Sequence, residues 1–213
     1  MNNKRIEISL TDFISFVNKT GHAKLTFVKS IRRRDVYEPS KDFYKYVRDA
    51  IQNMHKKSLN KDVLDKLLEN LTDEKKKSNY PSVIDGYKKF LGRTKYEWFN
   101  PPRKEWKIGN LRISLNPELG LEKKKKNGES TFYVIKLYFK DEQINKSQIQ
   151  QIITLMEMQL RGKVDYSEVK FCVLDVRKGK LLEYEANKED IALFEGEARS
   201  FAAIWEYLQR EDS

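Results

Sequence analysis

The chain has 213 residues, of which 39% are hydrophobic, 12% aromatic and 35% charged, and its formal net charge is +10. This length favours one domain, and the aromatic content can supply a core, so the composition excludes an intrinsically disordered chain. No apolar run is long enough to predict a transmembrane helix, the N-terminus does not resemble a signal peptide, and the single cysteine, Cys172, excludes an intramolecular disulfide.

Residues 1–93 are predicted to be mostly helical. Apolar residues recur there at helical spacing behind polar capping residues and a first-turn proline. In chain order we expect a helix capped by Ser9 or Thr11, a short strand at 24–28, helices at about 41–56 and from Asn60, a polar break at 72–80, and a helix with Pro81 in its first turn.

The pattern changes at about residue 94, where short alternating or apolar runs predict strands. We expect strands at 106–108 and 111–121, a hairpin loop at 123–130, a central strand at 132–139, a helix capped by Ser147, strands at 169–176 and 180–184, and a final helix at 190–209. This order predicts an α+β fold: one domain, 1–213, with a mixed central sheet of about five strands flanked by helices. The helical part, 1–93, is expected to pack on the sheet-containing core, 94–213.

Several common catalytic sites are not supported by the sequence. The two histidines, His22 and His55, are far apart and have no cysteine or histidine at ligand spacing, so a zinc site is not expected. No serine hydrolase motif, P-loop or dinucleotide fingerprint is present. His55 lies at the end of a predicted helix, where we expect it at the surface or near the helix dipole.

One lysine stands in an unusual place. Lys136 interrupts an apolar and aromatic run that predicts a central strand, and lysine is rarely buried without a partner. The preceding strand carries Glu118, and a hairpin through 123–130 would place that carboxylate beside Lys136.

The order helix, three strands, helix, strand, with an acid on the second strand and a lysine on the third, resembles the PD-(D/E)XK, or restriction-endonuclease-like, fold. The matching residues are Pro117-Glu118 and Val134-Ile135-Lys136, and the resemblance covers roughly 82–185. In that family two carboxylates hold Mg²⁺ and the lysine helps to activate water. The second acidic position holds Val134 here, and one carboxylate rarely suffices for Mg²⁺.

Three interpretations of this motif stay open. The missing acid has migrated, and Mg²⁺ is then held by Glu118 and another carboxylate; or the site is inactive and the fold binds without a cofactor; or Glu118 and Lys136 form a purely structural pair. The candidates for a migrated acid are Glu122, Glu129, Asp141, Glu142, Glu157 and Asp175.

Basic residues gather in three clusters. They are Arg32, Arg33 and Arg34; Lys75, Lys76 and Lys77; and Lys123, Lys124, Lys125 and Lys126. The first and the last are our candidate nucleic-acid contacts, since a lysine-rich hairpin tip can follow a phosphate backbone, although charged turns also guard strand edges. The aromatic residues Tyr96, Trp98, Phe99 and Trp106 can stack on bases, but we expect most of them in the core.

The sequence therefore leads to three hypotheses. The first is a cytoplasmic nucleic-acid-binding protein on a degenerate nuclease-like fold, which binds without cleavage. The alternatives are an active Mg²⁺-dependent nuclease with a migrated acidic ligand, and a basic structural or protein-interaction domain without enzymatic activity. The expected partners are nucleic acid or another protein, and no membrane.

Overall fold

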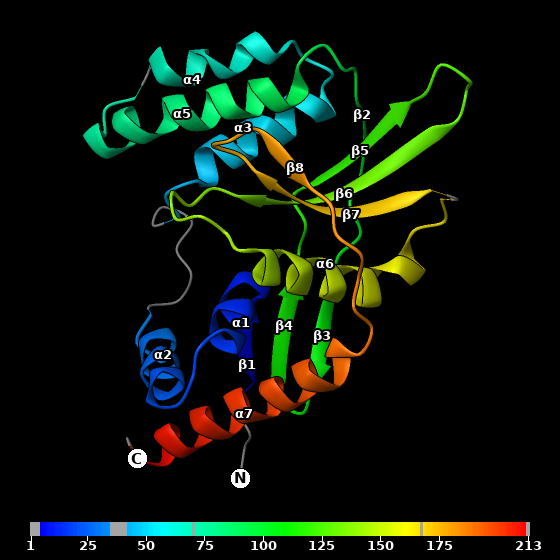
Figure 1. The fold of residues 1–213 in the computed structure, drawn as a ribbon. Helices are drawn as coiled ribbons and strands as arrows, with labels where there is room; N and C mark the ends of the chain where they lie inside the picture. The colour runs from blue at the N-terminus through cyan, green and yellow to red at the C-terminus, as the bar shows by residue number, and fades with distance from the viewer. Residues whose placement is uncertain (1–4, 35–41, 70, 167, 212–213) are drawn as a thin grey trace.

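The computed structural model describes residues 5–34, 42–69, 71–166 and 168–211 as an α+β fold with two sheets, as Figure 1 shows. One sheet has five strands and the other has three. Among the described residues, no helix is long and apolar enough to cross a membrane. The α+β class and the mixed five-stranded sheet are confirmed, whereas the second sheet was not predicted.

The five-stranded sheet has the order β2-β5-β6-β7-β8. Its β6 and β7 are parallel, and the other neighbours are antiparallel. Its strands are β2 (Glu97–Phe99), β5 (Leu119–Lys124), β6 (Ser130–Tyr138), β7 (Val169–Asp175) and β8 (Lys180–Leu182).

One face of this sheet is covered by α3 (Lys45–Lys56), α4 (Lys66–Glu69) and α5 (Glu74–Leu91), with a 3₁₀ turn at Lys61–Leu64 (Figure 1). The helix α5 lies very close to the turn after β7. A Cβ on Gly86 would stand only 2.0 Å from the Val176 carbonyl oxygen, so only glycine fits there.

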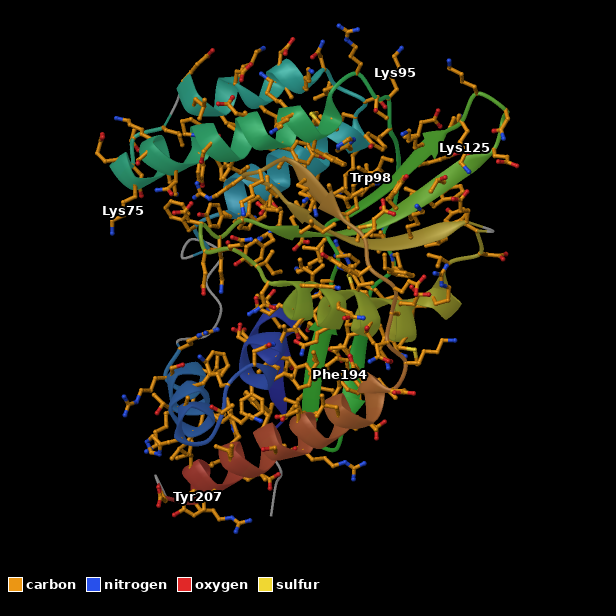
Figure 2. The ribbon with its side chains drawn as sticks, viewed as in Figure 1. Lys75, Lys95, Trp98, Lys125, Phe194 and Tyr207 are labelled. Atoms are coloured by element: carbon orange, nitrogen blue, oxygen red, sulfur yellow. The ribbon has the colours of Figure 1, made fainter. Side chains whose placement is uncertain are left out.

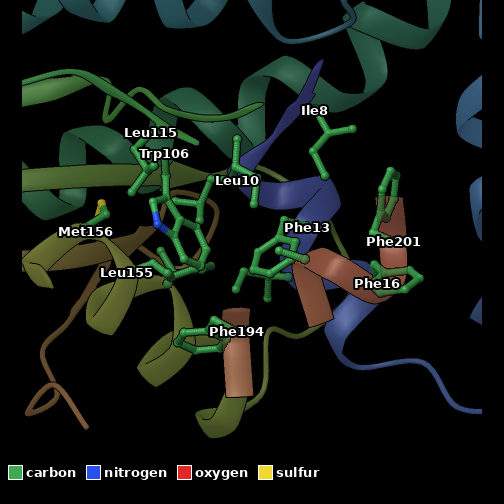
Figure 3. Close-up of a cluster of buried hydrophobic side chains, with 14 of the residues drawn as sticks. Ile8, Leu10, Phe13, Phe16, Trp106, Leu115, Leu155, Met156, Phe194 and Phe201 are labelled. Carbon is green, nitrogen blue, oxygen red and sulfur yellow. The ribbon is translucent and has the colours of Figure 1, made fainter. Parts of the chain in front are cut away.

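The three-stranded sheet contains β1 (Ile6–Ser9), β3 (Lys104–Ile108) and β4 (Leu111–Leu115), with β4 in the middle. It packs with α1 (Leu10–Val17), α2 (His22–Arg32) and α7 (Asp190–Glu211). Figure 3 shows aromatic side chains from these elements meeting in one core. The Phe13 ring lies edge-on to Trp106 at 5.9 Å, and Phe16 lies edge-on to Phe201 at 5.0 Å.

Between the two sheets lies α6 (Lys146–Leu160), which connects the parallel strands β6 and β7. A capping box starts this helix, because the Asn145 side chain accepts from the Gln148 N–H and the Gln148 side chain accepts from the Asn145 N–H. Because α6 is packed between the two sheets, even its Thr154 is fully buried. The cap is thus Asn145, and the prediction of Ser147 was wrong by two residues.

Three predictions in the N-terminal part were wrong. Residues 24–28 belong to α2 and not to a strand, because burying Val28 and Ile31 requires helical spacing. The supposed break at 72–80 lies mostly inside α5, which starts at Glu74, and its N-cap Asp73 accepts from the Lys76 N–H. Pro81 is therefore interior to the helix. An interior proline costs roughly 3 kcal/mol, which the burial of neighbouring apolar residues in the core offsets.

The predicted strand 111–121 is divided between the two sheets. It leaves the three-stranded sheet after Leu115 and enters the five-stranded sheet at Leu119, with Pro117 between. The strand predicted at 106–108 is part of β3, and it joins the small sheet instead of the large one. Likewise, α1 and α2 pack with the small sheet, while α3, α4 and α5 cover the large sheet as expected.

Candidate functional site

The structure brings Glu118 and Lys136 together, as the predicted hairpin required. The Lys136 Nζ lies 2.5 Å from the Glu118 Oε1, and the two side chains are only 16% and 10% exposed. The Lys136 Nζ also lies 3.4 Å from the Asn116 carbonyl oxygen. An ion pair so far removed from water is expected only where each charge has well-placed partners.

The bend between β4 and β5 explains the position of the carboxylate. The Glu118 N–H donates to the Ile135 carbonyl at 3.0 Å, and this is where backbone pairing with β6 begins. Beyond it, the Leu137 N–H has no strand residue opposite on that side and donates instead to the Glu118 Oε2, at 2.8 Å. Gln52 of α3 donates to the Glu118 carbonyl at 2.9 Å. Glu118 therefore satisfies a backbone donor of the central strand β6 beyond the start of β5, and it also neutralises Lys136.

The second acidic position of the motif does not supply a ligand. Val134 is fully buried in the apolar cluster between β6 and α6. Among the described residues, no group of three histidine, cysteine or acidic side chains is arranged to hold a metal ion. Both oxygens of Glu118 are already hydrogen-bonded. These residues therefore do not fit the octahedral oxygen ligands that Mg²⁺ requires.

The candidates for a migrated acid separate into two groups. Glu122 bonds the Ser130 hydroxyl, and Glu157 pairs with Arg161; Glu129 and Asp141 are exposed. Asp175 lies on β7 on the same face as Val173, which is the register partner of Lys136, and it is 5% exposed. Glu142 lines the cleft described next. Of the six acids, Asp175 thus lies on the same face of the sheet as Lys136, and Glu142 lines the same cleft.

A cleft of about 380 Å³ opens beside Lys136. Its walls come from α1 and α2 on one side and from β6 and the start of α6 on the other. Three of its lining residues are lysines, namely Lys19, Lys136 and Lys140, and one is acidic, Glu142. Asn18, Ser15 and Gln148 add polar groups. Because Lys136 is neutralised by Glu118, the net positive charge of the cleft comes from Lys19 and Lys140.

Lys19 and Lys140 were missed by sequence reasoning. Each is an isolated lysine in a polar segment, and 121 residues separate them in the chain. Only the packing of α1 and α2 beside the end of β6 brings them to one cleft. The basic residues of the sequence clusters, by contrast, lie elsewhere.

The hairpin lysines are far from the Glu118–Lys136 pair. Ser130 begins β6 at the hairpin end, and Lys136 lies six residues along the strand, which is about 20 Å. Figure 2 shows Lys125 at the hairpin and Lys75 at the opposite end of the helical layer. Hydrogen bonds to Glu97 and Glu168 raise the pKa of Lys124 and of Lys125, respectively. Two of the four hairpin charges are therefore locally compensated.

The arginine cluster lies at the C-terminal end of α2. Arg34 pairs with Asp12 at 2.8 Å, and the Arg32 guanidinium lies 5.7 Å from the centre of the Trp205 ring. Arg33 is exposed and lines a small cavity with Lys29. Of the three, only Arg32 belongs to α2, the helix that also carries Phe27 of the cleft beside Lys136.

The aromatic residues near the start of the second half pack within the protein, as expected for most of them. Trp106 is buried in the core, Tyr96 stacks on Phe90 at 5.5 Å, and Phe99 lies edge-on to Phe132. Trp98 is half-buried, with the Lys56 Nζ 5.3 Å from its ring centre.

His55 lies in the last turn of α3, as predicted, but it does not lie at the surface, so that part of the prediction was wrong. It is 8% exposed, and its Nε2 lies 2.5 Å from the Tyr87 hydroxyl oxygen. Burial lowers the pKa of His55 to about 4 and raises that of Tyr87 well above its usual value. The histidine is therefore neutral at neutral pH and serves the packing of α3 against α5.

Comparison with known proteins assigns no family, since neither a protein-family model nor a curated protein matches the chain. A functional assignment must therefore rest on the site itself.

Proposed function

We propose that this protein binds nucleic acid on a degenerate PD-(D/E)XK-like core and does not cleave it. The single observation that carries the proposal is the Glu118–Lys136 pair beside a lysine-lined cleft, with Val134 in the place of the second acid. The lysine and the first acid of the motif stand together, while the donor set for Mg²⁺ is incomplete.

The order of elements supports the proposed core. In chain order it is α5, β2, β5, β6, α6 and β7, which is a helix, three neighbouring strands, a helix and a strand. The pair β3–β4 is inserted between the first and the second of these strands. Glu118 directly precedes the second strand, and Lys136 is on the third. These are the positions at which the family carries its acid and its lysine.

The charge of the molecule supports a polyanionic partner. A formal net charge of +10 raises the rate of encounter with nucleic acid. In the cleft, Lys19 and Lys140 outweigh Glu142. A phosphate in the cleft would face these two ammonium groups and Lys136, for which it would compete with Glu118.

Binding and cleavage can be separated in one experiment. Labelled single- and double-stranded DNA and RNA are titrated with the protein over a salt series, with and without Mg²⁺ or Mn²⁺, and the products are run on a denaturing gel. We expect binding that weakens with salt and strands that stay intact with either metal. Lys136→Ala is expected to weaken binding per folded molecule, and Lys75→Ala, far from the cleft, serves as the matched control.

Each other outcome has a definite meaning. Metal-dependent shortening of the strands would overturn the proposal in favour of an active nuclease, for which the buried Asp175 on the face of Lys136 is the specific supporting observation. Absence of binding even at low salt would leave a structural or protein-interaction domain. If Lys136→Ala reduced the stability of the fold but left binding per folded molecule unchanged, the Glu118–Lys136 pair would not be part of the binding site.

A further inference from the structure

The cleft beside Lys136 is lined by apolar side chains as well as by lysines. Phe27 of α2 and Tyr138 of β6 line it and are both half-buried. Buried aliphatic residues complete the apolar part, namely Ile14, Leu137, Ile144, Ile152 and Val173. Apolar surface with a few charged groups is typical of pockets for small ligands. The volume of about 380 Å³ lies in the usual range of such pockets, about 300–1,000 Å³.

The lysines of the cleft stand on both of its walls. Lys19 follows α1, and its Nζ lies 5.3 Å from the centre of the Phe27 ring. Lys140 follows β6 and belongs to the other wall, together with Lys136. An aromatic ring and an ammonium group therefore lie next to each other on the first wall, and a second ammonium group is available from the opposite side.

The charges of the lining nearly balance one another. The charge of Lys136 is neutralised by Glu118. Lys19 and Lys140 contribute two positive charges, and Glu142 offsets one of them, so one net positive charge remains. A phosphodiester carries a single negative charge, whereas a terminal phosphate carries about −1.5 to −2 at neutral pH. The lining thus matches a phosphate within a strand better than that of a free mononucleotide.

A duplex would leave the apolar part of this cleft unused. Its bases are paired and stacked on one another, and most of its contacts with proteins are made by phosphates and sugars. The base faces of a single strand are open, and every base has a face that can stack on an aromatic side chain. A ligand that uses both the Phe27 ring and the ammonium groups is therefore an unpaired nucleotide.

We infer that the cleft takes one nucleotide of a single-stranded nucleic acid, with its base against Phe27 and its phosphodiester near Lys19 and Lys140. The inference rests on the proposed function and adds the class of ligand. The side-chain oxygen of Gln148 accepts from the Asn145 N–H, so its NH₂ group is the part that can donate into the cleft. Stacking and phosphate contacts do not distinguish bases, and binding here is therefore largely independent of sequence.

The test separates the ring from the charges. Phe27→Leu removes the aromatic ring and keeps an apolar side chain. Its control is Phe90→Leu, because Phe90 is also half-buried but stacks on Tyr96 outside the cleft. Lys19→Gln with Lys140→Gln removes two positive charges from the cleft, and Lys66→Gln with Lys75→Gln removes two exposed charges from the distant helices α4 and α5.

The measurement is the affinity, per folded molecule, for a short labelled single strand and for the same strand in a duplex, over a salt series. Thymidine 5′-monophosphate serves as a competitor. We expect Phe27→Leu to weaken single-strand binding about fivefold or more, and duplex binding less than about twofold. The cleft lysine variant should reduce the salt slope on the single strand by about 1.4 units, since each phosphate contact contributes about 0.7. Both control variants should leave these values nearly unchanged.

Equal effects of Phe27→Leu on single strand and duplex, or no effect on either, would overturn insertion of a nucleotide into the cleft but not nucleic-acid binding. Thymidine 5′-monophosphate that competes as well as the strand itself would also overturn the inference, in favour of a site for free nucleotides. If the unmodified protein binds neither strand nor duplex even at low salt, the proposed function itself fails.

Discussion

Replacing Lys136 by methionine tests whether the ion pair is a desolvated unit. The change keeps most of the side-chain volume and removes the ammonium group. Glu118, whose side chain is 10% exposed, would then keep only the Leu137 N–H as a close donor. Removing one partner of a fully buried pair costs about 3–5 kcal/mol. The remaining exposure and the retained Leu137 bond reduce the expected cost to about 2–3 kcal/mol.

The second half of the test changes Glu118. In Glu118→Gln the amide oxygen can still accept from the Leu137 N–H, but the amide NH₂ then faces the Lys136 ammonium. Two donors would oppose each other, and a cost of about 2–3 kcal/mol is again expected. The double variant has no buried charge and keeps the Leu137 bond. It should cost only about 1 kcal/mol, which gives a coupling energy of about 3–5 kcal/mol, the sum of the two single costs less that of the double variant.

The assay is urea unfolding followed by far-UV circular dichroism and by the fluorescence of the three tryptophans. Lys140→Met is the control, because Lys140 is an exposed lysine of the same cleft, and we expect it to change stability by less than about 0.5 kcal/mol. If Lys136→Met were equally harmless and the double variant additive, the pair would be solvated and the reasoning would be refuted.

Two further predictions concern the helical layer on the large sheet. Because burial lowers the pKa of His55 from 6.5 to about 4, the unfolded chain takes up a proton first as the pH falls, and stability should drop by about 2–3 kcal/mol between about pH 7 and pH 4.5. His55→Gln should flatten that dependence in unfolding midpoints, and an unchanged profile would assign it to other groups. Gly86→Ala would place a Cβ 2.0 Å from the Val176 carbonyl oxygen and should cost about 3 kcal/mol. Gly196→Ala in α7, where nothing lies within 4 Å, should instead stabilise by about 0.5–1 kcal/mol; similar thermal shifts in both variants would contradict the close approach.

Local patterns predicted most elements of the large sheet. The hairpin at 123–130, the central strand through Lys136 and the strand through Cys172 follow from alternation, apolar runs and an Asn-Gly turn. The predicted hairpin also placed Glu118 beside Lys136, as the structure shows. The predicted pair was accessible to sequence reasoning because its two residues lie only 18 positions apart on one hairpin.

The division into two sheets was not accessible in the same way. Residues 111–121 alternate continuously, and the pattern does not show that β4 pairs with β1 while β5 pairs with β6. Pro117, which lacks a ladder donor, was the available signal for a break. The strand β2 has only three residues and was missed, whereas β8, which is equally short, was predicted because it directly follows the turn at 177–179.

Contacts between residues far apart in the sequence could not be predicted, for a different reason. His55 carries no local sign of Tyr87, which lies 32 positions away on another helix. Lys19 and Lys140 meet at one cleft only because α1 and α2 pack beside β6. Sequence reasoning therefore found the part of the site that belongs to one hairpin, and missed the part that tertiary packing assembles.

The two roles of Glu118 explain why the pair can persist without a metal. With Val134 instead of an acid at position 134, Lys136 still needs a partner that neutralises its charge, and the Leu137 N–H still needs an acceptor. Both needs are structural, and each is costly to leave unmet. The pair alone is consequently no sign of catalysis. Because the pair is neutral as a unit, affinity for a polyanion would depend mainly on the charges around it, which in the cleft are Lys19 and Lys140.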